Sequence, residues 1–289
     1  MGDAVQTIGI FGLGLIGSAV ARRLIGAGYK VAGYDPAPTS NAALADLGGM
    51  PCTQAQVWDA DVIFSCVFDT DQLAAVIEAA PVMAKPLVSV STCDPDRMQG
   101  LAECASAKGI TLIEAPISGT SRALGEGDVL IMAAGDRDVI DDIAQILNAL
   151  SRQYLYVGTI GNGNRAKLAI NLVLGLNRAA LAEGLVFAEA LGLAPDDFLN
   201  IARASAAQSA VMDSKGDMMA RREFAPQGRI VQSAKDFTLI RNGAATKGQG
   251  LPFTETYLAM MRDAIEHGEG DLDNSAVLLP IARAKSRDA

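Results

Sequence analysis

Near its N-terminus the chain reads Gln6-Thr7-Ile8-Gly9-Ile10-Phe11-Gly12-Leu13-Gly14-Leu15-Ile16-Gly17, and after a helical run to Ala27 it reads Lys30-Val31-Ala32-Gly33-Tyr34-Asp35. The apolar run that ends at Phe11 is typical of a buried strand, and Val20, Leu24 and Ala27 fall at helical spacing. A second strand then ends at Asp35. The order of strand, glycine turn, helix, strand and acid predicts a parallel βαβ unit.

The three glycines of this unit predict a site for the pyrophosphate of a dinucleotide. Gly12 permits a tight turn, Gly14 lets the backbone approach the phosphates, and Gly17 lets the helix pack closely on the strand. The backbone from Gly12 to Gly17, which includes Leu15 and Ile16, would then bind the pyrophosphate where the helix dipole favours negative charge.

Asp35 indicates which dinucleotide is bound. A carboxylate at the end of the second strand accepts a hydrogen bond from a ribose 2′-hydroxyl, and it repels a 2′-phosphate unless an arginine lies nearby. Residues 36–45 contain no Lys or Arg. We therefore predict NAD as the cofactor rather than NADP. The alternative is a solvated acid before a turn at Pro36.

The composition excludes several classes of function. The chain has 289 residues, 50% of them hydrophobic, and a formal net charge of −9. Such an acidic protein is not expected to bind nucleic acid, whose phosphates require a basic surface. No uncharged apolar run approaches about 18 residues, so we expect no membrane span. The four cysteines form no C-x-x-C pair, which favours free thiols and a cytoplasmic location.

The alternation of short apolar runs with helical stretches continues to about residue 160. Strands are predicted at 61–67, 87–90, 110–113, 128–133 and 154–157, with helices at 71–79, 95–107 and 138–150 between them. This pattern predicts a doubly wound, mostly parallel α/β sheet of the Rossmann type. We assign residues 1–162 to this cofactor-binding domain.

From residue 163 the strand signals stop. Residues 164–193 form one long apolar-periodic helix, followed by helical segments at 195–204, 209–221, 229–246, 253–268 and 274–285. Residues 163–289 are therefore predicted to form an all-helical domain for substrate binding and oligomerisation, joined to the first by the long helix. Because a helix this apolar is hard to bury in a monomer, we expect a homodimer or homotetramer.

Lys167 is the best candidate for proton transfer. The chain has one histidine, His267, which lies in a polar C-terminal stretch, so neither histidine catalysis nor a metal site is expected. Lys167 and Asn171 are four residues apart and share one helix face. Apolar neighbours predict that Lys167 is partly buried, which would lower its pKa from about 10.4 toward neutrality. A lysine that extends to solvent at a helix end is the alternative.

A second candidate site follows the strand at 110–113. Ligands of open α/β sheets bind beyond the carboxyl ends of the strands. The chain there reads Glu114-Ala115-Pro116-Ile117-Ser118-Gly119-Thr120-Ser121-Arg122. Backbone N–H groups and the hydroxyls of Ser118 and Thr120 could hold a substrate carboxylate, with added charge from Arg122. A capped surface turn without a ligand is the alternative.

Taken together, these motifs resemble the β-hydroxyacid dehydrogenase family, which includes 3-hydroxyisobutyrate dehydrogenase and 2-hydroxy-3-oxopropionate reductase. The resemblance rests on the glycine motif, Ser91-Thr92, Ala115-Pro116-Ile117-Ser118-Gly119, Gly163-x-x-x-Lys167-x-x-x-Asn171 and Lys235-Asp236, in this order over almost the whole chain. It implies an NAD(P)-dependent dehydrogenase or reductase acting on a small anionic hydroxy acid or aldehyde.

The resemblance also implies roles for single residues. Lys167 would be the catalytic acid and base, and Asn171 would orient the substrate oxygen. Ser118 and Gly119 would bind the substrate carboxylate. The residues that would line the cofactor are Val67, Thr92 and Lys235.

The chain departs from the family pattern at three places. Thr120 stands where a second glycine is common, Glu114 where Asp is common, and Val67-Phe68 where Leu-Pro is common. With Arg122 beside it, Thr120 changes the acid-binding loop, so a related anionic aldehyde, with four carbons or a sulfonate, is an alternative substrate.

Three other functions remain open. An imine reductase shares the architecture but usually has Asp or Tyr in place of the lysine. A 6-phosphogluconate-type decarboxylating enzyme usually has a longer helical domain. A non-catalytic NAD-sensing protein would need the cofactor site alone.

Overall fold

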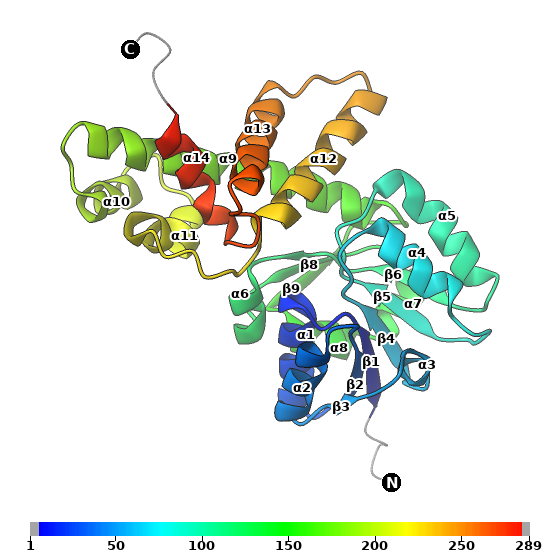
Figure 1. Ribbon diagram of the computed structural model, residues 1–289. Coiled ribbons are helices and arrows are strands. Elements are labelled where there is room, and N and C mark those ends of the chain that lie inside the picture. The colour runs from blue at the N-terminus through cyan, green and yellow to red at the C-terminus, as the bar shows by residue number, and fades with distance from the viewer. Residues whose placement is uncertain (1–5, 285–289) are drawn as a thin grey trace. The chain divides into compact units, whose positions relative to one another are not determined.

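The computed structural model describes residues 6–284 (Figure 1). They divide into two compact units, with the division in the chain between Lys167 and Leu168. This junction lies inside a continuous helix, α9 (Asn162–Ala190), whereas the predicted domain boundary was at its beginning. Each unit has its own hydrophobic core.

The N-terminal unit is built on a six-stranded sheet in which every neighbouring pair is parallel. Across the sheet the strands are β3 (Met50–Pro51), β2 (Lys30–Tyr34), β1 (Thr7–Phe11), β4 (Val62–Ser65), β5 (Pro86–Ser89) and β6 (Thr111–Glu114). The chain reverses its direction of travel across the sheet between β1 and β4. This is the Rossmann arrangement predicted from the sequence. Its short edge strand, β3, was not predicted.

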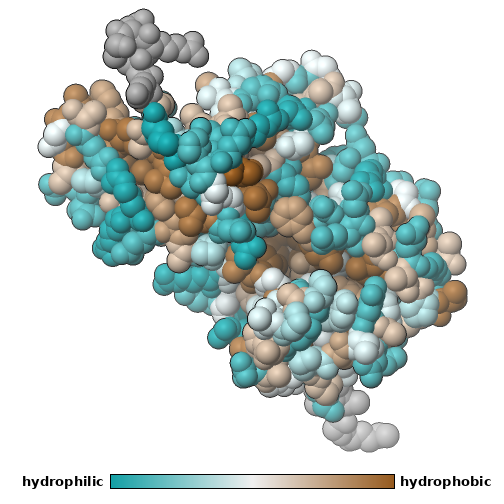
Figure 2. All heavy atoms as spheres, in the orientation of Figure 1, coloured by the Kyte–Doolittle hydropathy of each residue, from teal (hydrophilic) through white to brown (hydrophobic). Residues whose placement is uncertain are grey.

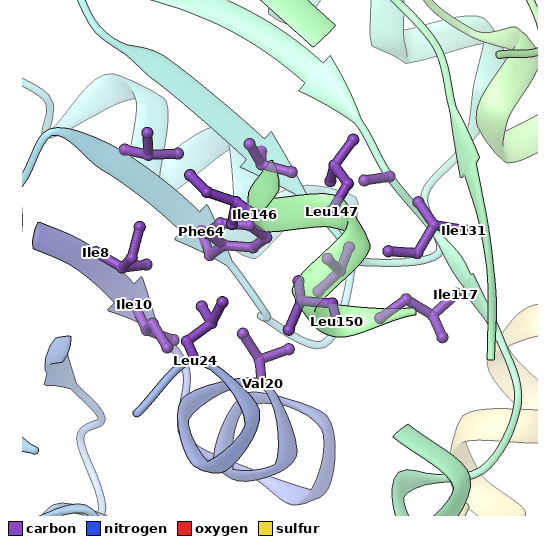
Figure 3. Close-up of a cluster of buried hydrophobic side chains, with 14 of the residues drawn as sticks. Ile8, Ile10, Val20, Leu24, Phe64, Ile117, Ile131, Ile146, Leu147 and Leu150 are labelled. Carbon is purple, nitrogen blue, oxygen red and sulfur yellow. The ribbon is translucent and has the colours of Figure 1, made fainter. Parts of the chain in front are cut away.

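Helices cover both faces of this sheet. The helices between its strands are α1 (Leu15–Gly26), α2 (Pro38–Asp46), α3 (Gln54–Val57), α4 (Thr70–Glu78) and α5 (Pro95–Ser106). On one face, Ile8, Ile10 and Phe64 pack with Val20 and Leu24 of α1 (Figure 3). The other face buries Phe11, Ile63 and Leu112 with residues of α4 and α5. Because both faces are covered, the strands read as nearly continuous apolar runs.

A second, three-stranded sheet completes this unit. It consists of β7 (Ile117–Ser118), β8 (Leu130–Ala133) and β9 (Gln153–Tyr156), and β7 pairs with β8 in the antiparallel sense. Its helices are α6 (Ser121–Glu126), α7 (Arg137–Asp142) and α8 (Ala144–Leu150). Two expectations were therefore wrong. These strands form a sheet of their own, which an antiparallel bridge between Glu114 and Ala134 joins to the end of β6. The helix predicted at 138–150 is broken at Ile143, where ψ is 10°.

The C-terminal unit is all-helical, as predicted. After α9 come α10 (Pro195–Ala204), α11 (Ala210–Arg221), α12 (Ile230–Thr246), α13 (Pro252–Glu266), the 3-10 helix η1 (Asn274–Val277) and α14 (Leu278–Arg283). Leu181 and Leu185 of α9 pack there with Phe237 of α12 and Tyr257 of α13. The last predicted helix is thus a 3-10 turn followed by α14, and position 285 lies outside the described residues.

Helix α9 is long and apolar enough, by length and composition alone, to cross a membrane, and 22% of its 18-residue apolar window is buried. Core helices of other proteins meet the same criterion. Here α9 contributes to the core of the C-terminal unit, and Arg178 in its middle donates a hydrogen bond to the Tyr257 hydroxyl at 2.8 Å. Figure 2 shows exposed apolar side chains, in brown, near the junction of α9 and α10.

A buried ion pair ties together three segments of the C-terminal unit. Lys215 of α11 lies 2.8 Å from a carboxylate oxygen of Asp273, which precedes η1. The same carboxylate accepts hydrogen bonds from the backbone N–H groups of Gln227, Gly228 and Ser275. Asp273 is therefore the point that joins α11, the 227–228 loop and the C-terminal segment.

Candidate functional site

The glycine turn after β1 has the geometry that the sequence predicts. Gly12 has φ of +83°, and a Cβ atom there would lie 2.8 Å from the Cys66 carbonyl oxygen. A Cβ atom on Gly17 would lie 1.9 Å from the carbonyl oxygen of Gly12. A Cβ atom on Gly14 would meet nothing within 4 Å. Gly12 and Gly17 are thus required by the fold, whereas Gly14 leaves open space over the turn.

The start of α1 fits the pyrophosphate of a dinucleotide. Gly14 is the residue before the helix, and neither a side-chain cap nor an acidic residue in the first turn competes for the first N–H groups. These N–H groups, which include those of Leu15, Ile16 and Gly17, form the positive end of the helix. The turn can therefore hold the phosphates through backbone atoms alone.

Asp35 lies at the carboxyl end of β2, beside this turn. One carboxylate oxygen accepts the Leu13 N–H at 2.7 Å and the other accepts the Ala37 N–H at 2.8 Å. The Asn41 side chain binds the Asp35 backbone at both its N–H and its carbonyl. A carboxylate has about four acceptor positions, so Asp35 can still accept a hydrogen bond from a ribose hydroxyl.

The loops after β4 and β5 lie at the same edge of the sheet and are joined to each other. The Ser91 hydroxyl donates to the Val67 carbonyl at 2.7 Å, and the Asp94 N–H donates to the Thr70 hydroxyl at 2.9 Å. These bonds bring together the loops that carry Val67 and Thr92, the two residues expected to line the cofactor in this unit.

The expected carboxylate loop begins in β7 and ends in α6. Gly119 has φ of +153°, and a Cβ atom there would lie 2.5 Å from the Val129 side chain. The Thr120 hydroxyl caps α6 by accepting the Ala123 N–H at 3.1 Å. Arg122 forms an exposed ion pair with Glu126 at 3.2 Å. Thr120 and Arg122 thus have local partners, and their roles toward a substrate stay predictions, as does that of Ser118.

Lys167 lies in the second turn of α9 with 8% of its surface exposed, so its predicted burial is confirmed. The preceding turn of the helix is bound to Glu114, the last residue of β6. Glu114 is fully buried, and its carboxylate accepts hydrogen bonds from the N–H groups of Gly161 and Asn164. Asn164 lies inside the first turn of α9 with a buried side chain.

In the C-terminal unit, Asn171 and Lys235 share a partner that sequence reasoning missed. The Asn171 amide donates to Asp236 at 2.8 Å, and the Lys235 ammonium lies 3.0 Å from the other oxygen of the same carboxylate. Asp236 therefore fixes the orientation of the Asn171 amide. The sequence analysis named the Lys235-Asp236 pair but gave a role only to the lysine, although the acid beside it could have been recognised as a partner.

The remaining candidates from the sequence are the single histidine and the potential metal ligands. His267 is exposed at the end of α13, with its ring nitrogen 2.8 Å from the Asp263 carbonyl oxygen. No three His, Cys, Asp or Glu residues between positions 6 and 284 are grouped so that they could hold a metal ion. Lys167 is the buried amine that lies closest in sequence to the acid-binding motifs.

Comparison with family models gives two matches that together cover nearly all of the chain. Residues 7–158 match the NAD binding domain of 6-phosphogluconate dehydrogenase. Residues 161–281 match a family described as NAD-binding of NADP-dependent 3-hydroxyisobutyrate dehydrogenase.

Several curated proteins are similar over most of the chain. The 2-hydroxy-3-oxopropionate reductase of Escherichia coli is 29% identical over 94% of this chain and 95% of its own length. Glyoxylate/succinic semialdehyde reductase 1 of Arabidopsis thaliana is 27% identical over 94% and 96%. Cytokine-like nuclear factor N-PAC of Drosophila melanogaster is 28% identical over 95% of this chain, which spans 47%, about half, of that relative's length.

Solved structures share the fold. A 3-hydroxyisobutyrate dehydrogenase from Salmonella typhimurium has a TM-score of 0.86 at 24% identity, over 95% of this chain and 99% of that one. Psf3, in complex with NADP+ and 2-OPP, has a TM-score of 0.86 at 20% identity, over 94% and 99%. An imine reductase from Pseudomonas sp. has a TM-score of 0.67 at 21% identity, over 96% and 100%.

The glycine turn, the acid at the end of β2 and the lysine helix are thus found in a chain that matches both family models in sequence order. Two of its relatives are named as reductases, one of 2-hydroxy-3-oxopropionate and one of glyoxylate and succinic semialdehyde. The chain belongs to the β-hydroxyacid dehydrogenase family of NAD(P)-dependent oxidoreductases.

Proposed function

We propose that this protein is an NAD-dependent oxidoreductase that interconverts a short 3-hydroxy acid and its semialdehyde, with Lys167 as the general acid and base. The observation that carries the proposal is the burial of Lys167, one helical turn before Asn171 on α9. A buried amine is suited to proton transfer near neutral pH because burial disfavours its charged form.

Each residue has a distinct task in this proposal. The Lys167 amine accepts the proton of the substrate hydroxyl during oxidation and returns it during reduction. The Asn171 amide, oriented by Asp236, donates to the substrate oxygen. The Ser118 hydroxyl and the Gly119 N–H hold the substrate carboxylate. The bound nicotinamide supplies the hydride chemistry.

The preference for NAD rests on Asp35 and on the absence of Lys and Arg from residues 36–45. NADP is the alternative that must be tested, because the matching family description names an NADP-dependent enzyme and Psf3 was solved with NADP+. A 2′-phosphate would have to lie beside the Asp35 carboxylate, which costs affinity unless a cation intervenes.

The substrate is proposed to be in the 3-hydroxyisobutyrate or 2-hydroxy-3-oxopropionate class. A four-carbon or sulfonated aldehyde is the second candidate, because Thr120 and Arg122 alter the expected carboxylate loop. The Arabidopsis relative, named for glyoxylate and succinic semialdehyde, favours including both of those aldehydes in any test.

We also propose that the protein forms a homodimer or homotetramer through its helical unit. Large apolar side chains are exposed there, with Phe187 of α9 63% exposed, Leu191 65% and Ile201 of α10 61%. Exposed apolar groups of this kind are commonly covered at an interface between subunits.

The decisive experiment is turnover with a panel of substrates and both nicotinamides. The panel contains 3-hydroxyisobutyrate, glycerate, 4-hydroxybutyrate, threonate, the corresponding aldehydes, glyoxylate, a sulfonated analogue and a cyclic imine. We expect the highest kcat/KM with NAD and a short 3-hydroxy acid or its semialdehyde. Preferential reduction of the imine would instead favour an imine reductase, and no turnover of any member would favour an NAD-sensing protein.

The Lys167→Ala variant then tests the mechanism. We expect kcat to fall by about 10²- to 10⁴-fold, the usual contribution of a general acid or base. The dissociation constant of NADH should change little, because the phosphates are held by the glycine turn. Lys247→Ala, an exposed lysine after α12, is the matched control and should retain full activity. Near-normal turnover in Lys167→Ala would contradict the proposed mechanism.

A further inference from the structure

Glu114 is a carboxylate that the proposed reaction does not use, yet it is completely buried at the end of β6. Residues two apart in a strand point to the same face, so Glu114 points to the face on which Leu112 joins the apolar core. Burying a charge there is costly unless hydrogen bonds compensate it. The partners of Glu114 should therefore reveal its role.

The backbone of Glu114 pairs with Ala134 in an antiparallel bridge, whereas its carboxylate binds Gly161, just before α9, and Asn164 in the first turn of α9. One carboxylate oxygen accepts the backbone N–H of Gly161, and the other accepts both the backbone N–H and the side-chain amide of Asn164. Burial raises the pKa of Glu114, while hydrogen bonds from Asn164, Gly161 and Gly163 oppose that rise. An ionised carboxylate suits this site because it only accepts hydrogen bonds and because the helix dipole favours an anion there.

Asn164 extends the connection to a third segment. Its side-chain oxygen accepts the Cys93 N–H at 2.7 Å, while its side-chain nitrogen donates to Glu114. Cys93 directly follows Thr92, which is expected to line the cofactor. The amide of Asn164 is thus held at both ends, and its oxygen and nitrogen cannot exchange places without losing both bonds.

Gly163 allows this arrangement to form. A Cβ atom on Gly163 would lie 2.9 Å from the Cβ atom of Glu114 and 3.2 Å from the Met132 carbonyl oxygen. The glycine therefore lets the first turn of α9 approach the end of β6 closely enough for the hydrogen bonds. Close packing against Glu114 and Met132 thus explains the glycine at position 163 without any ligand.

We propose that Glu114 and Asn164 are positioning residues that fix the first turn of α9, and hence Lys167, relative to the cofactor loop at Thr92–Cys93 and the carboxylate loop that follows β6. Lys167 is three residues beyond Asn164, nearly one helical turn. The three groups that must act together in the proposed function, on which this inference rests, are then joined through one carboxylate and one amide.

The test exchanges donor and acceptor between the two side chains. In Glu114→Gln an amide nitrogen faces N–H donors, and in Asn164→Asp an oxygen faces the Glu114 carboxylate, so each single variant breaks the link. In the double variant the amide nitrogen of the new Gln donates to the new Asp, which still accepts the Cys93 N–H. This nitrogen also faces the backbone N–H of residue 164, so the link is restored in part. Glu114→Asp keeps an acceptor-only carboxylate at a shorter reach. Arg165→Ala, exposed on the same turn, is the matched control.

We expect each of the single variants Glu114→Gln and Asn164→Asp to lower kcat by at least about tenfold, with the NADH dissociation constant changed by less than about threefold. The double variant should recover a substantial part of this loss, and Glu114→Asp should be more active than Glu114→Gln. Wild-type kcat in both single variants would overturn the proposal. So would equal losses of kcat, NADH binding and thermal stability with no recovery in the double variant, since that is the behaviour of a merely structural pair.

Hydrogen exchange measured by mass spectrometry gives a readout that needs no substrate. The amides of residues 161–167 should exchange faster in either single variant than in the wild type and should slow again in the double variant. If the wild type turns over no member of the panel, the proposed function fails, yet this comparison still decides whether the link exists. Unchanged exchange in Glu114→Gln and Asn164→Asp would overturn it.

Discussion

Gly14 and Gly17 belong to one motif, but glycine is needed at the two positions for different physical reasons. A side chain at Gly17 would collide with the backbone of the turn itself, whereas a side chain at Gly14 would enter open space. Gly17 is therefore demanded by folding, and Gly14 by the space that a ligand would occupy.

This difference can be measured with two alanine variants. Gly17→Ala should destabilise the protein by about 1–3 kcal/mol, the usual cost of forcing extra atoms into a packed site, and should lower Tm. Gly14→Ala should keep the Tm of the wild type and weaken NADH binding, because its methyl group occupies the approach to the phosphates. Thermal denaturation and NADH fluorescence titration separate the two effects. A Gly14→Ala variant with wild-type affinity would place the phosphates elsewhere.

At the scale of elements, the helices of the C-terminal unit depend on the buried pair Lys215–Asp273. Although burial by itself raises the pKa of Asp273, the Lys215 ammonium and the N–H donors outweigh it, so the pKa lies below its ordinary value. Because the folded pKa is lower than the unfolded one, the ionised form stabilises the fold at neutral pH. This contribution is lost as the pH falls below about 4, the unfolded value, toward the folded pKa.

Asp273→Asn should therefore destabilise the protein at pH 7 by about 3–5 kcal/mol, since it leaves the Lys215 charge buried without its partner. The difference from the wild type should shrink in acid, where the wild-type carboxylate is also protonated. Asp141→Asn breaks the exposed pair with Arg137 and should change stability by less than about 1 kcal/mol. Urea denaturation between pH 3 and 7 checks both, and a constant difference across that range would contradict the assignment.

The elements also show what local sequence can predict. The strands of the first sheet, apart from the two-residue strand β3, and the helices α9 to α13 were predicted because a long periodic run of apolar residues indicates burial. The second sheet was not, since strand pairing is decided by distant residues such as Ile117 and Ile131, which carry no local sign of their antiparallel register. The break at Ile143 was missed because the apolar period continues across it.

The candidate site was predictable to a similar extent. Lys167, Asn171 and the glycine turn carry recognisable motifs, so their neighbourhoods could be predicted. Glu114 was noted only as a departure from a family pattern, and Asn164 was given no role. Their hydrogen bonds join positions 47 to 71 residues apart, which no local pattern reveals. A charged residue that ends an apolar strand was the available signal.

At the scale of the whole molecule, the exposed apolar residues of the helical unit predict self-association. The chain has a mass of 30.0 kDa, so light scattering after gel filtration should give about twice or four times that value. Phe187→Asp should shift the protein toward smaller species, because a charge would be buried in the interface. Val82→Asp, at an exposed apolar position of the N-terminal unit, is the control. A wild-type monomer at micromolar concentration would contradict the proposal.

The two compact units share one uninterrupted helix, and this has a consequence for the pair Lys167 and Asn171. Lys167 belongs to the N-terminal unit and Asn171 to the C-terminal unit. Four helical steps of about 1.5 Å set the distance between them along the axis. Rotation of one unit against the other cannot alter that spacing unless the helix itself bends or melts. A single inserted residue between them, by contrast, would turn the amide by about 100° away from the amine. The helix therefore fixes the separation of Lys167 and Asn171 along its axis, and a change in its length would alter their relative orientation.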